Sequence, residues 1–199
     1  MVFPHGFVEG VDYVIRAINR NHPILVMSIH GGSIEPFTSE IAESIAGTDY
    51  SFYDFRGIMN KSNKVLHIPS IYFNDSKLAT ILSNCKCAIS IHGEKSIAEN
   101  FVCIGGLNYT LSQLVIEQLI EIGIEVRDLG TRFRGMNPSH VVNRPSYNGV
   151  QIEISRGLRY LLEISNSTPH SGESIFDGFV NSIRISITAY LPILQEYIQ

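Results

Sequence analysis

Two apolar runs in the sequence end in the same four residues, Ser-Ile-His-Gly, and each copy supplies an imidazole. The first copy lies in ILVMSIHGGSIE and the second in CAISIHGEK, so the histidines are His30 and His92. Glu35 follows His30 by five positions, beyond a Gly-Gly pair that allows a sharp turn. Two imidazoles and one carboxylate are a common ligand set for catalytic Zn²⁺, which leaves a fourth position for water. The pattern therefore predicts a zinc site formed by His30, Glu35 and His92.

This interpretation competes with a plainer one, in which each histidine is structural. A single histidine at the end of a strand is more often held by a hydrogen bond than by a metal. The matching positions of His92 and Glu35 favour the ligand role for His30, because a metal site requires several converging donors. His67, in LHIPS, is expected either in the core or beside the site. The remaining histidines are expected in loops or near a short helix: His5, His22, His140 and His170.

The two apolar runs must bring the histidines together for any of this chemistry to occur. ILVMSI and CAISI are continuously apolar, which is typical of strands buried on both faces of a largely parallel sheet. Open α/β sheets bind ligands in the crevice at the carboxyl ends of their strands, where both histidines fall. We therefore expect His30 and His92 to point into one crevice, provided that their strands are near neighbours.

Glu153 is a second candidate for chemistry. It lies in VQIEIS, an alternating segment that predicts a strand with apolar residues on one face and polar residues on the other. A glutamate is unfavourable in the middle of a strand, so its presence requires a reason. Either it pairs with Arg156 or Arg159, or it is the general base beside the metal.

Arginine is concentrated late in the sequence. Six of the ten arginines lie between Arg127 and Arg159, where the acidic residues are Asp128 and Glu153. The planar guanidinium binds carboxylates through two hydrogen bonds, so this concentration favours recognition of an anionic substrate. The alternative is a rim of solvated basic residues.

Short β-rich apolar runs alternate with amphipathic stretches along the chain, which predicts an α/β layer architecture. No linker or low-complexity tract interrupts it, so residues 1–199 are expected to form one domain. The predicted strands are Asp12–Ala17, Ile24–Ile29, Ser51–Phe55, Lys64–Ile68, Cys87–Ile91, Asn100–Ile104, Ile124–Arg127 and Val150–Ile154. The predicted helices are Thr38–Ala46, Asn74–Asn84, Tyr109–Ile122 and a last long helix over roughly Ile175–Ile198.

Composition excludes several classes of protein. The 199 residues are 44% hydrophobic, enough for one full core. A net charge of -4 argues against a generic nucleic-acid binder. No apolar segment is long enough for a membrane span or resembles a signal peptide, so we expect a protein made in the cytoplasm that does not bind membranes. We also expect it to be a monomer. Three cysteines without a C-x-x-C pair suggest neither a disulfide framework nor a thiolate zinc site.

Taken together, SIHGGSIE, SIHG, the pair Asn143-Arg144 and GVQIEISRGLR resemble the zinc-dependent poly-γ-glutamate hydrolases of Bacillus phages and their bacterial relatives. The resemblance covers approximately Pro23 to Arg159, and its specificity lies in the combination of motifs. It implies a carboxypeptidase-like α/β fold, with three layers around a mixed, largely parallel sheet.

The resemblance also implies roles for individual residues. His30, Glu35 and His92 match the zinc ligands of the family, and Glu153 matches its catalytic glutamate. The residues that it associates with substrate binding are Asn143, Arg144, Arg132 and Arg134, the last two less closely. The His-x4-Glu spacing departs from the His-x-x-Glu of ordinary carboxypeptidases, which argues against a digestive exopeptidase.

We therefore hypothesise a zinc hydrolase that cleaves γ-glutamyl amide bonds in poly-γ-glutamate, an anionic polymer, with lysis of the host as a route of release. One alternative is an amidohydrolase or deacylase that acts on small N-acylglutamate-like compounds. A second alternative is a non-catalytic phage binding or structural protein, in which the histidines are structural. Metal content distinguishes the non-catalytic protein from the two enzymes, and the length of the products distinguishes the polymer hydrolase from the small-substrate amidohydrolase.

Overall fold

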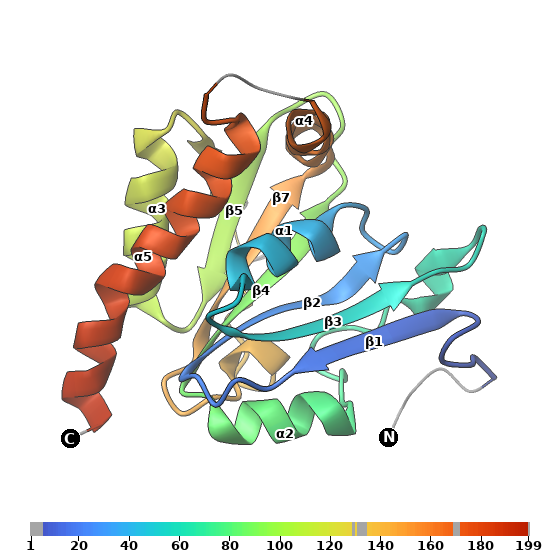
Figure 1. The fold of residues 1–199 in the computed structure, drawn as a ribbon, viewed down its shortest axis with the longest axis horizontal. Coiled ribbons are helices and arrows are strands. Elements are labelled where there is room, and N and C mark those ends of the chain that lie inside the picture. Colours follow the sequence, from blue (N-terminus) through green and yellow to red (C-terminus); the bar gives the residue numbers. More distant parts are fainter. Residues whose placement is uncertain (1–5, 129, 131–134, 169–171, 199) are drawn as a thin grey trace.

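A central β-sheet organises the molecule. The computed structural model describes residues 6–128, 130, 135–168 and 172–198 (Figure 1). Within these residues seven strands form one mixed sheet, in the order β1-β3-β2-β4-β7-β5-β6. Their bounds are β1 Tyr13–Ile18, β2 Ile24–Gly32, β3 Ser51–Gly57, β4 Cys87–Glu94, β5 Phe101–Gly106, β6 Glu125–Val126 and β7 Gly149–Ser155.

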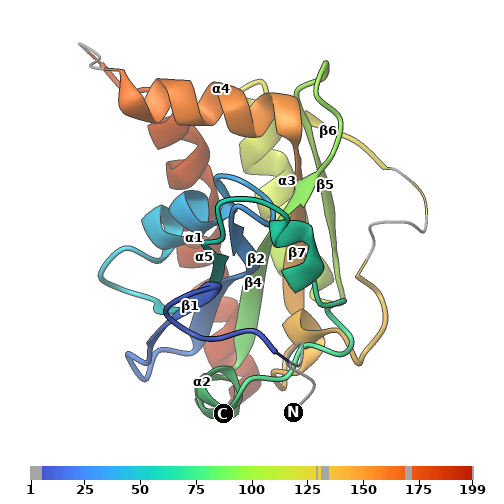
Figure 2. The same ribbon diagram turned by 90° about the vertical axis from the view of Figure 1, so that its right-hand side faces the viewer.

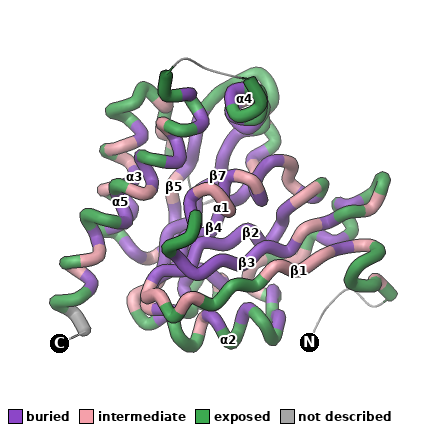
Figure 3. The backbone as a smooth tube through the Cα atoms, in the orientation of Figure 1, coloured by how far each residue is buried: buried purple, intermediate pink, exposed green. Residues whose placement is uncertain are grey.

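The middle of the sheet is parallel and its edges are not. β3, β2, β4 and β7 run parallel to one another, whereas β1 pairs antiparallel with β3 and β5 pairs antiparallel with β7. β2, β4 and β7 are buried along almost their whole length (Figure 3). This agrees with the continuous apolar runs of β2 and β4, because a strand covered on both faces has no solvent side to carry polar residues.

Helices cover both faces of the sheet (Figures 1 and 2). The α-helices are α1 Thr38–Ala46, α2 Ser76–Asn84, α3 Tyr109–Glu121, α4 Arg156–Ser167 and α5 Ile175–Ile198, and the 3₁₀ helices are η1 Asn63–Leu66 and η3 Val141–Asn143. α1, α3, α4 and α5 share one apolar core with the sheet, and α2 packs into a second core on the other face. The predicted three-layer α/β fold with a mixed, largely parallel sheet is thus confirmed.

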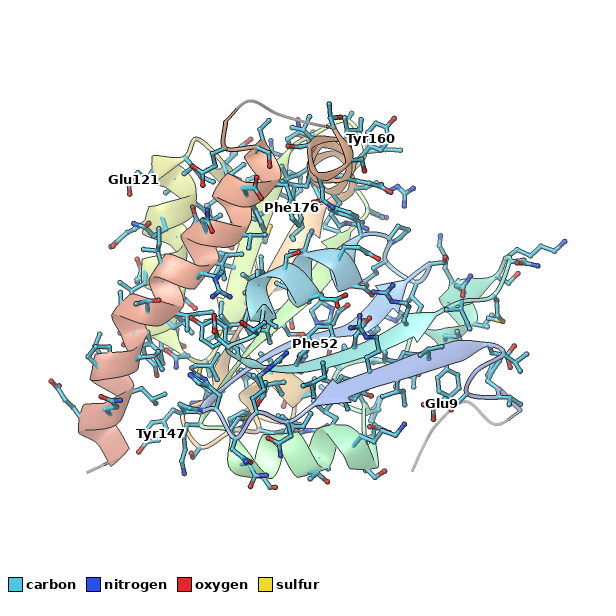
Figure 4. The ribbon with its side chains drawn as sticks, in the orientation of Figure 1. Glu9, Phe52, Glu121, Tyr147, Tyr160 and Phe176 are labelled. Atoms are coloured by element: carbon cyan, nitrogen blue, oxygen red, sulfur yellow. The ribbon has the colours of Figure 1, made fainter. Side chains whose placement is uncertain are left out.

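The first core is the larger of the two. Phe52 from β3 and Phe176 from α5 both lie in it, and Figure 4 shows their side chains between the sheet and the helices of that face. Ile24 and Val26 of β2 face this core, whereas Leu25, Met27 and Ile29 face the core under α2. This division follows from the alternation of side chains along a strand. No helix among the described residues combines the length and the apolar character that spanning a membrane requires.

Two sequence-based predictions about elements need correction. The strand predicted at Lys64–Ile68 is wrong, because residues 63–66 form the 3₁₀ helix η1. Leu66 is buried there while Val65 is exposed, and so short an apolar run does not distinguish a strand from a helical turn. The sequence analysis also missed α4, which begins directly after β7. Leu158 and Leu162 of α4 lie four residues apart on its buried face, which is a helical spacing.

Candidate metal centre and active site

β2 and β4 are hydrogen-bonded neighbours, and they bring His30 and His92 together near their carboxyl ends. The Nδ1 atoms of the two imidazoles lie 3.2 Å apart. A carboxylate oxygen of Glu35 lies 3.2 Å from Nδ1 of His30, and the other lies 3.7 Å from Nδ1 of His92. One donor atom from each of these residues fits within a span of 4.8 Å. The three candidate ligands therefore converge, although 62 residues separate the histidines in sequence.

The outer nitrogen of each imidazole is already engaged. Nε2 of His30 lies 2.8 Å from the carbonyl oxygen of Ile68, which can only accept, so this nitrogen carries the proton. Nε2 of His92 lies 2.8 Å from Oγ of Ser90, two residues earlier on the same face of β4. Partners of this kind fix the tautomer and orientation of a ligating histidine. They leave the two Nδ1 atoms facing Glu35.

A tight turn after β2 positions Glu35. The backbone N–H of Gly32 donates to Oγ of Ser39 at 2.8 Å, and this hydroxyl donates to Oδ1 of the buried Asp54 at 2.8 Å. A Cβ atom on Gly31 would lie 2.1 Å from both of these side-chain oxygens, so only glycine fits. The register of β2 against β3 also shifts between Ser28 and Gly31, an irregularity that can redirect a side chain.

Backbone contacts then hold the carboxylate of Glu35 in place. The N–H of Gly93, the residue after His92, donates to its Oε2 at 2.7 Å. Burial alone would raise the pKa of Glu35, but His30, followed by His67 and His92, lowers it well below its usual range. The carboxylate is therefore ionised at neutral pH. It contributes the negative charge that a divalent cation requires.

His67 completes the cluster of imidazoles. Its ring stacks on that of His30 with the centroids 3.8 Å apart, and its Nε2 lies 3.3 Å from Oε1 of Glu35. The hydrogen bond to Glu35 raises the pKa of His67, whose side chain is about half exposed. The sequence predicted His67 either in the core or beside the site, and the structure places it beside the site. It acts here as a partner of Glu35.

Glu153 enters the same site from the next strand. In the register of β4 and β7 it pairs directly with His92, and both residues belong to the same face of the sheet. Nε2 of Gln151, two residues earlier, donates to Oε1 of Glu153 at 2.9 Å. Burial, and then the nearby charge of Glu35, raise the pKa of Glu153 to about 8. A carboxyl group whose pKa lies this close to neutrality can both accept and release a proton.

The sequence left open that Glu153 is a structural residue that forms an ion pair with Arg156 or Arg159. Neither ion pair is present in the part of the chain that the structure describes. The guanidinium of Arg159 is buried and donates instead to the carbonyl oxygens of Pro36, Ile154 and Glu94, at 2.5, 3.1 and 3.1 Å. Arg156 is exposed at the start of α4. Glu153 thus forms no ion pair within 4 Å with a described basic residue, although the charge of Arg159 still acts on it.

These side chains surround a cavity of about 320 Å³. Its lining also includes His140, Gln151 and Lys95, none of which the sequence analysis had assigned to the site. Gln151 precedes Glu153 by two residues, as Ser90 precedes His92, so strand alternation could have indicated both. The lining residues are His30, Glu35, His67, Ser70, His92, Gly93, Glu94, Lys95, His140, Gln151 and Glu153.

The donor set fits a divalent transition metal such as zinc. Burial lowers the pKa of His92 to about 3, so its imidazole is neutral at pH 7, as a metal ligand must be. Two imidazole nitrogens and an ionised carboxylate then converge within 4.8 Å. Lone pairs this close repel one another unless a proton or a cation lies between them. Three protein donors with an adjoining cavity match an open catalytic site better than a closed structural one.

The residues expected to bind substrate have different environments. Asn143 is buried, and among the described residues its amide bonds to backbone groups: to the carbonyls of Gly135 and Asn137 and to the N–H of Leu107. Arg144 is exposed and makes a long contact, 3.4 Å, with the carbonyl of Ile71.

Arg144 does not line the cavity, but His140, four residues earlier, does. Burial, and then the charge of Arg144, lower the pKa of His140. Arg144 therefore lies near the cavity without lining it. Arg132 and Arg134 lie outside the described residues.

Comparisons with known proteins give both a family and a fold. The family described as Poly-gamma-glutamate hydrolase matches residues 6–182. The UPF0714 protein YndL of Bacillus subtilis strain 168 is 30% identical over 151 residues, which is 74% of this chain and 59% of YndL. The SPbeta prophage-derived UPF0714 protein YoqZ of the same strain is 30% identical over 152 residues, or 75% of this chain and 55% of YoqZ. The chain thus spans less than two thirds of the length of these curated relatives.

Solved structures show the same fold. A bacteriophage poly-γ-glutamate hydrolase superimposes with a TM-score of 0.86 at 27% identity, covering 94% of this chain and 93% of that one. A zinc-free structure of YndL gives a TM-score of 0.80 at 28% identity, covering 90% and 92%. The N-acetylmuramoyl-L-alanine amidase AmiC2 of Nostoc punctiforme, at 12% identity and a TM-score of 0.54, shares the fold alone.

Proposed function

Because this chain belongs to the poly-γ-glutamate hydrolase family, we propose that it is a zinc-dependent hydrolase of the γ-glutamyl amide bonds in poly-γ-glutamate. The proposal rests on the pairing of Glu153 with His92 across β4 and β7. This pairing places a candidate proton acceptor beside three candidate metal donors. We propose that residues 1–199 act as one domain and as a monomer. The site belongs to β2, β4, β7 and the turn after β2.

His30, Glu35 and His92 would hold the zinc ion. When bound, zinc supplies a Lewis acid that activates water and polarises the scissile carbonyl. Gln151 keeps Oε1 of Glu153 engaged, so the other oxygen of this carboxylate is the one that accepts the proton of the attacking water. Glu153 then returns that proton to the nitrogen of the leaving glutamate. A single group can perform both transfers because its pKa lies close to neutrality.

Each γ-linked glutamate keeps a free α-carboxylate, so the substrate is a regular polyanion. Arg144 is exposed near His140 at the cavity, and we propose that its guanidinium binds one of these carboxylates. Asn143 supports this role indirectly, because its bonds to the backbone at residues 107, 135 and 137 hold the segment that carries Arg144. We keep Arg132 and Arg134 as further candidates for the same polyanion.

The test of this function compares three substrates: poly-γ-glutamate, α-linked polyglutamate and small N-acylglutamates. The zinc-loaded protein should shorten only the γ-linked polymer, measured as chain length over time. Glu153→Gln keeps the shape of the side chain and leaves the metal donors intact. It should retain zinc and lose about 10²–10⁴-fold in rate, the range for general acid–base catalysis.

Other outcomes would contradict the proposal. Release of acyl groups from N-acylglutamates, with no effect on the polymer, would assign the protein to small-substrate amidohydrolases. Absence of both activities in a zinc-loaded protein would favour a non-catalytic role. Full activity of Glu153→Gln would remove Glu153 from the mechanism.

A further inference from the structure

A second groove adjoins the catalytic cavity. It has a volume of about 600 Å³, and four of its lining residues also line the cavity: Glu35, His67, Gly93 and Lys95. The two spaces therefore adjoin at these four residues. His140 and Gln151 line the cavity but not this groove.

Basic side chains from three separate segments converge on this groove. Lys64 comes from η1, Lys95 follows β4, and Arg156 is the first residue of α4. All three are exposed, and none forms an ion pair or a side-chain hydrogen bond with another described residue. The one acidic residue in the described lining is Glu35, whose carboxylate already bonds Gly93 and the histidines.

Arg159 adds a fixed positive charge to the same groove. It is held beneath Gly93, where an added Cβ would lie 2.7 Å from its guanidinium. Its hydrogen bonds go to neutral carbonyl groups, so no described carboxylate cancels its charge by direct contact. The side chain is buried and rigid, whereas the three exposed basic side chains can adjust to a ligand.

The position of Arg156 is unfavourable for folding. It occupies the first turn of α4, where the helix dipole is positive, and that turn contains no acidic residue. Cations are disfavoured at this end of a helix, and Asp or Glu is preferred there. A bound anion would turn this unfavourable charge into a favourable contact.

We propose that this cationic groove, formed by Lys64, Lys95, Arg156 and Arg159, binds α-carboxylates of the poly-γ-glutamate chain beyond the scissile bond. The inference rests on the proposed function and deepens it. Because the groove adjoins the catalytic cavity, the polymer extends away from the metal site along it. Long chains are thereby held more tightly than short oligomers, and cleavage at internal bonds follows.

The experiment replaces the exposed basic residues by glutamine, as Lys64→Gln, Lys95→Gln and Arg156→Gln, singly and together. The substrates are long poly-γ-glutamate and a γ-linked glutamate trimer. For the long polymer, KM should rise about two- to fivefold per substitution, the range for exposed ion pairs. The triple variant should show roughly a tenfold or larger rise, because separated contacts add. The rise should be clearly smaller for the trimer, which has too few carboxylates to fill the groove.

The control is Lys86→Gln. Lys86 directly precedes the first residue of β4, at the opposite end of the strand from Gly93, and it does not line the groove. Its KM for the polymer should match that of the wild type. Added salt should raise KM of the wild type more steeply than KM of the triple variant, because screening acts on charges that the variant lacks.

The results separate this inference from the proposed function. If the wild type cleaves the polymer and the triple variant has the KM of Lys86→Gln, the groove does not bind substrate and the inference is wrong. An equal rise in KM for trimer and polymer would also contradict it, since it would place the charges at the scissile bond itself. A zinc-loaded wild type that leaves poly-γ-glutamate intact would contradict the proposed function.

Discussion

The charge states of the metal donors are set by their surroundings before any metal binds. The imidazole of His92 is kept neutral by burial, and the carboxylate of Glu35 is kept ionised by the histidines around it. Each group therefore already has the protonation state of a ligand.

Removal of either histidine should abolish zinc binding. His30→Ala and His92→Ala each delete one of three protein donors, whereas the wild type should hold about one zinc per chain. Elemental analysis after purification without added metal measures this. His22→Ala is the matched control, because His22 precedes β2 and caps the N–H of Ile24 away from the site. Equal zinc content in all four proteins would disprove the assignment.

The raised pKa of Glu153 predicts a pH-dependent stability in the zinc-free protein. Its folded-state pKa of about 8 lies above the ordinary value for glutamate, about 4.3 in an unfolded chain. Between these values the folded state binds more protons than the unfolded state, so the free energy of unfolding falls as pH rises.

The variant Glu153→Gln has no carboxyl group at this position, so it does not bind the proton that the wild type binds there. From pH 5 to pH 8 the zinc-free variant should therefore gain stability relative to the zinc-free wild type, by up to about a few kcal/mol. Urea unfolding at several pH values measures the difference. Parallel curves for the two proteins would show that Glu153 is ionised throughout this range.

At the scale of elements, the turn between β2 and α1 controls the site, because it carries Glu35. Gly31→Ala would force its new Cβ against Asp54 and Ser39. The expected cost is about 1–3 kcal/mol of unfolding free energy, as for other overpacked sites. Zinc affinity should fall as well, because the turn cannot shift without moving Glu35.

Gly178→Ala provides the comparison for Gly31→Ala. Gly178 lies in α5, and an added Cβ there meets no atom within 4 Å. Alanine is favoured over glycine in a helix interior by roughly 0.5–1 kcal/mol, so this variant should be slightly more stable. Its zinc affinity should equal that of the wild type. A Gly31→Ala protein with normal stability and zinc affinity would show that the turn is more adaptable than its contacts indicate.

At the scale of the whole molecule, the metal site joins β2, β4 and the turn before α1, so zinc should stabilise the entire fold. A ligand that binds only the folded state adds about 2.7 kcal/mol when its free concentration is 100 times Kd. The thermal unfolding midpoint should rise with zinc and fall after chelation. His92→Ala should show no such response, and Mg²⁺ should not replace zinc, because it prefers oxygen ligands. Identical midpoints with zinc and with chelator would argue against a site of this kind.

The sequence by itself determined the central strands and indicated the three residues that we propose as metal donors. β2, β4 and β7 are continuous or alternating apolar runs, and such patterns depend only on neighbouring residues and on which faces are buried. The placement of His30 and His92 near strand ends then limited where they could meet. Helix α1 was predicted with its observed bounds for the same local reason.

Only the tertiary structure decided which side chains share the site. The sheet order places β4 between β2 and β7, and the register sets His92 opposite Glu153; neither follows from periodicity, because pairing is a long-range property. His67 stacks on His30 only because the segment after η1 passes over the carboxyl end of β2. The cationic groove likewise combines segments that are distant in sequence. Patterns along a chain record burial and local propensity, whereas the packing of loops against strand ends determines which charged groups face one another.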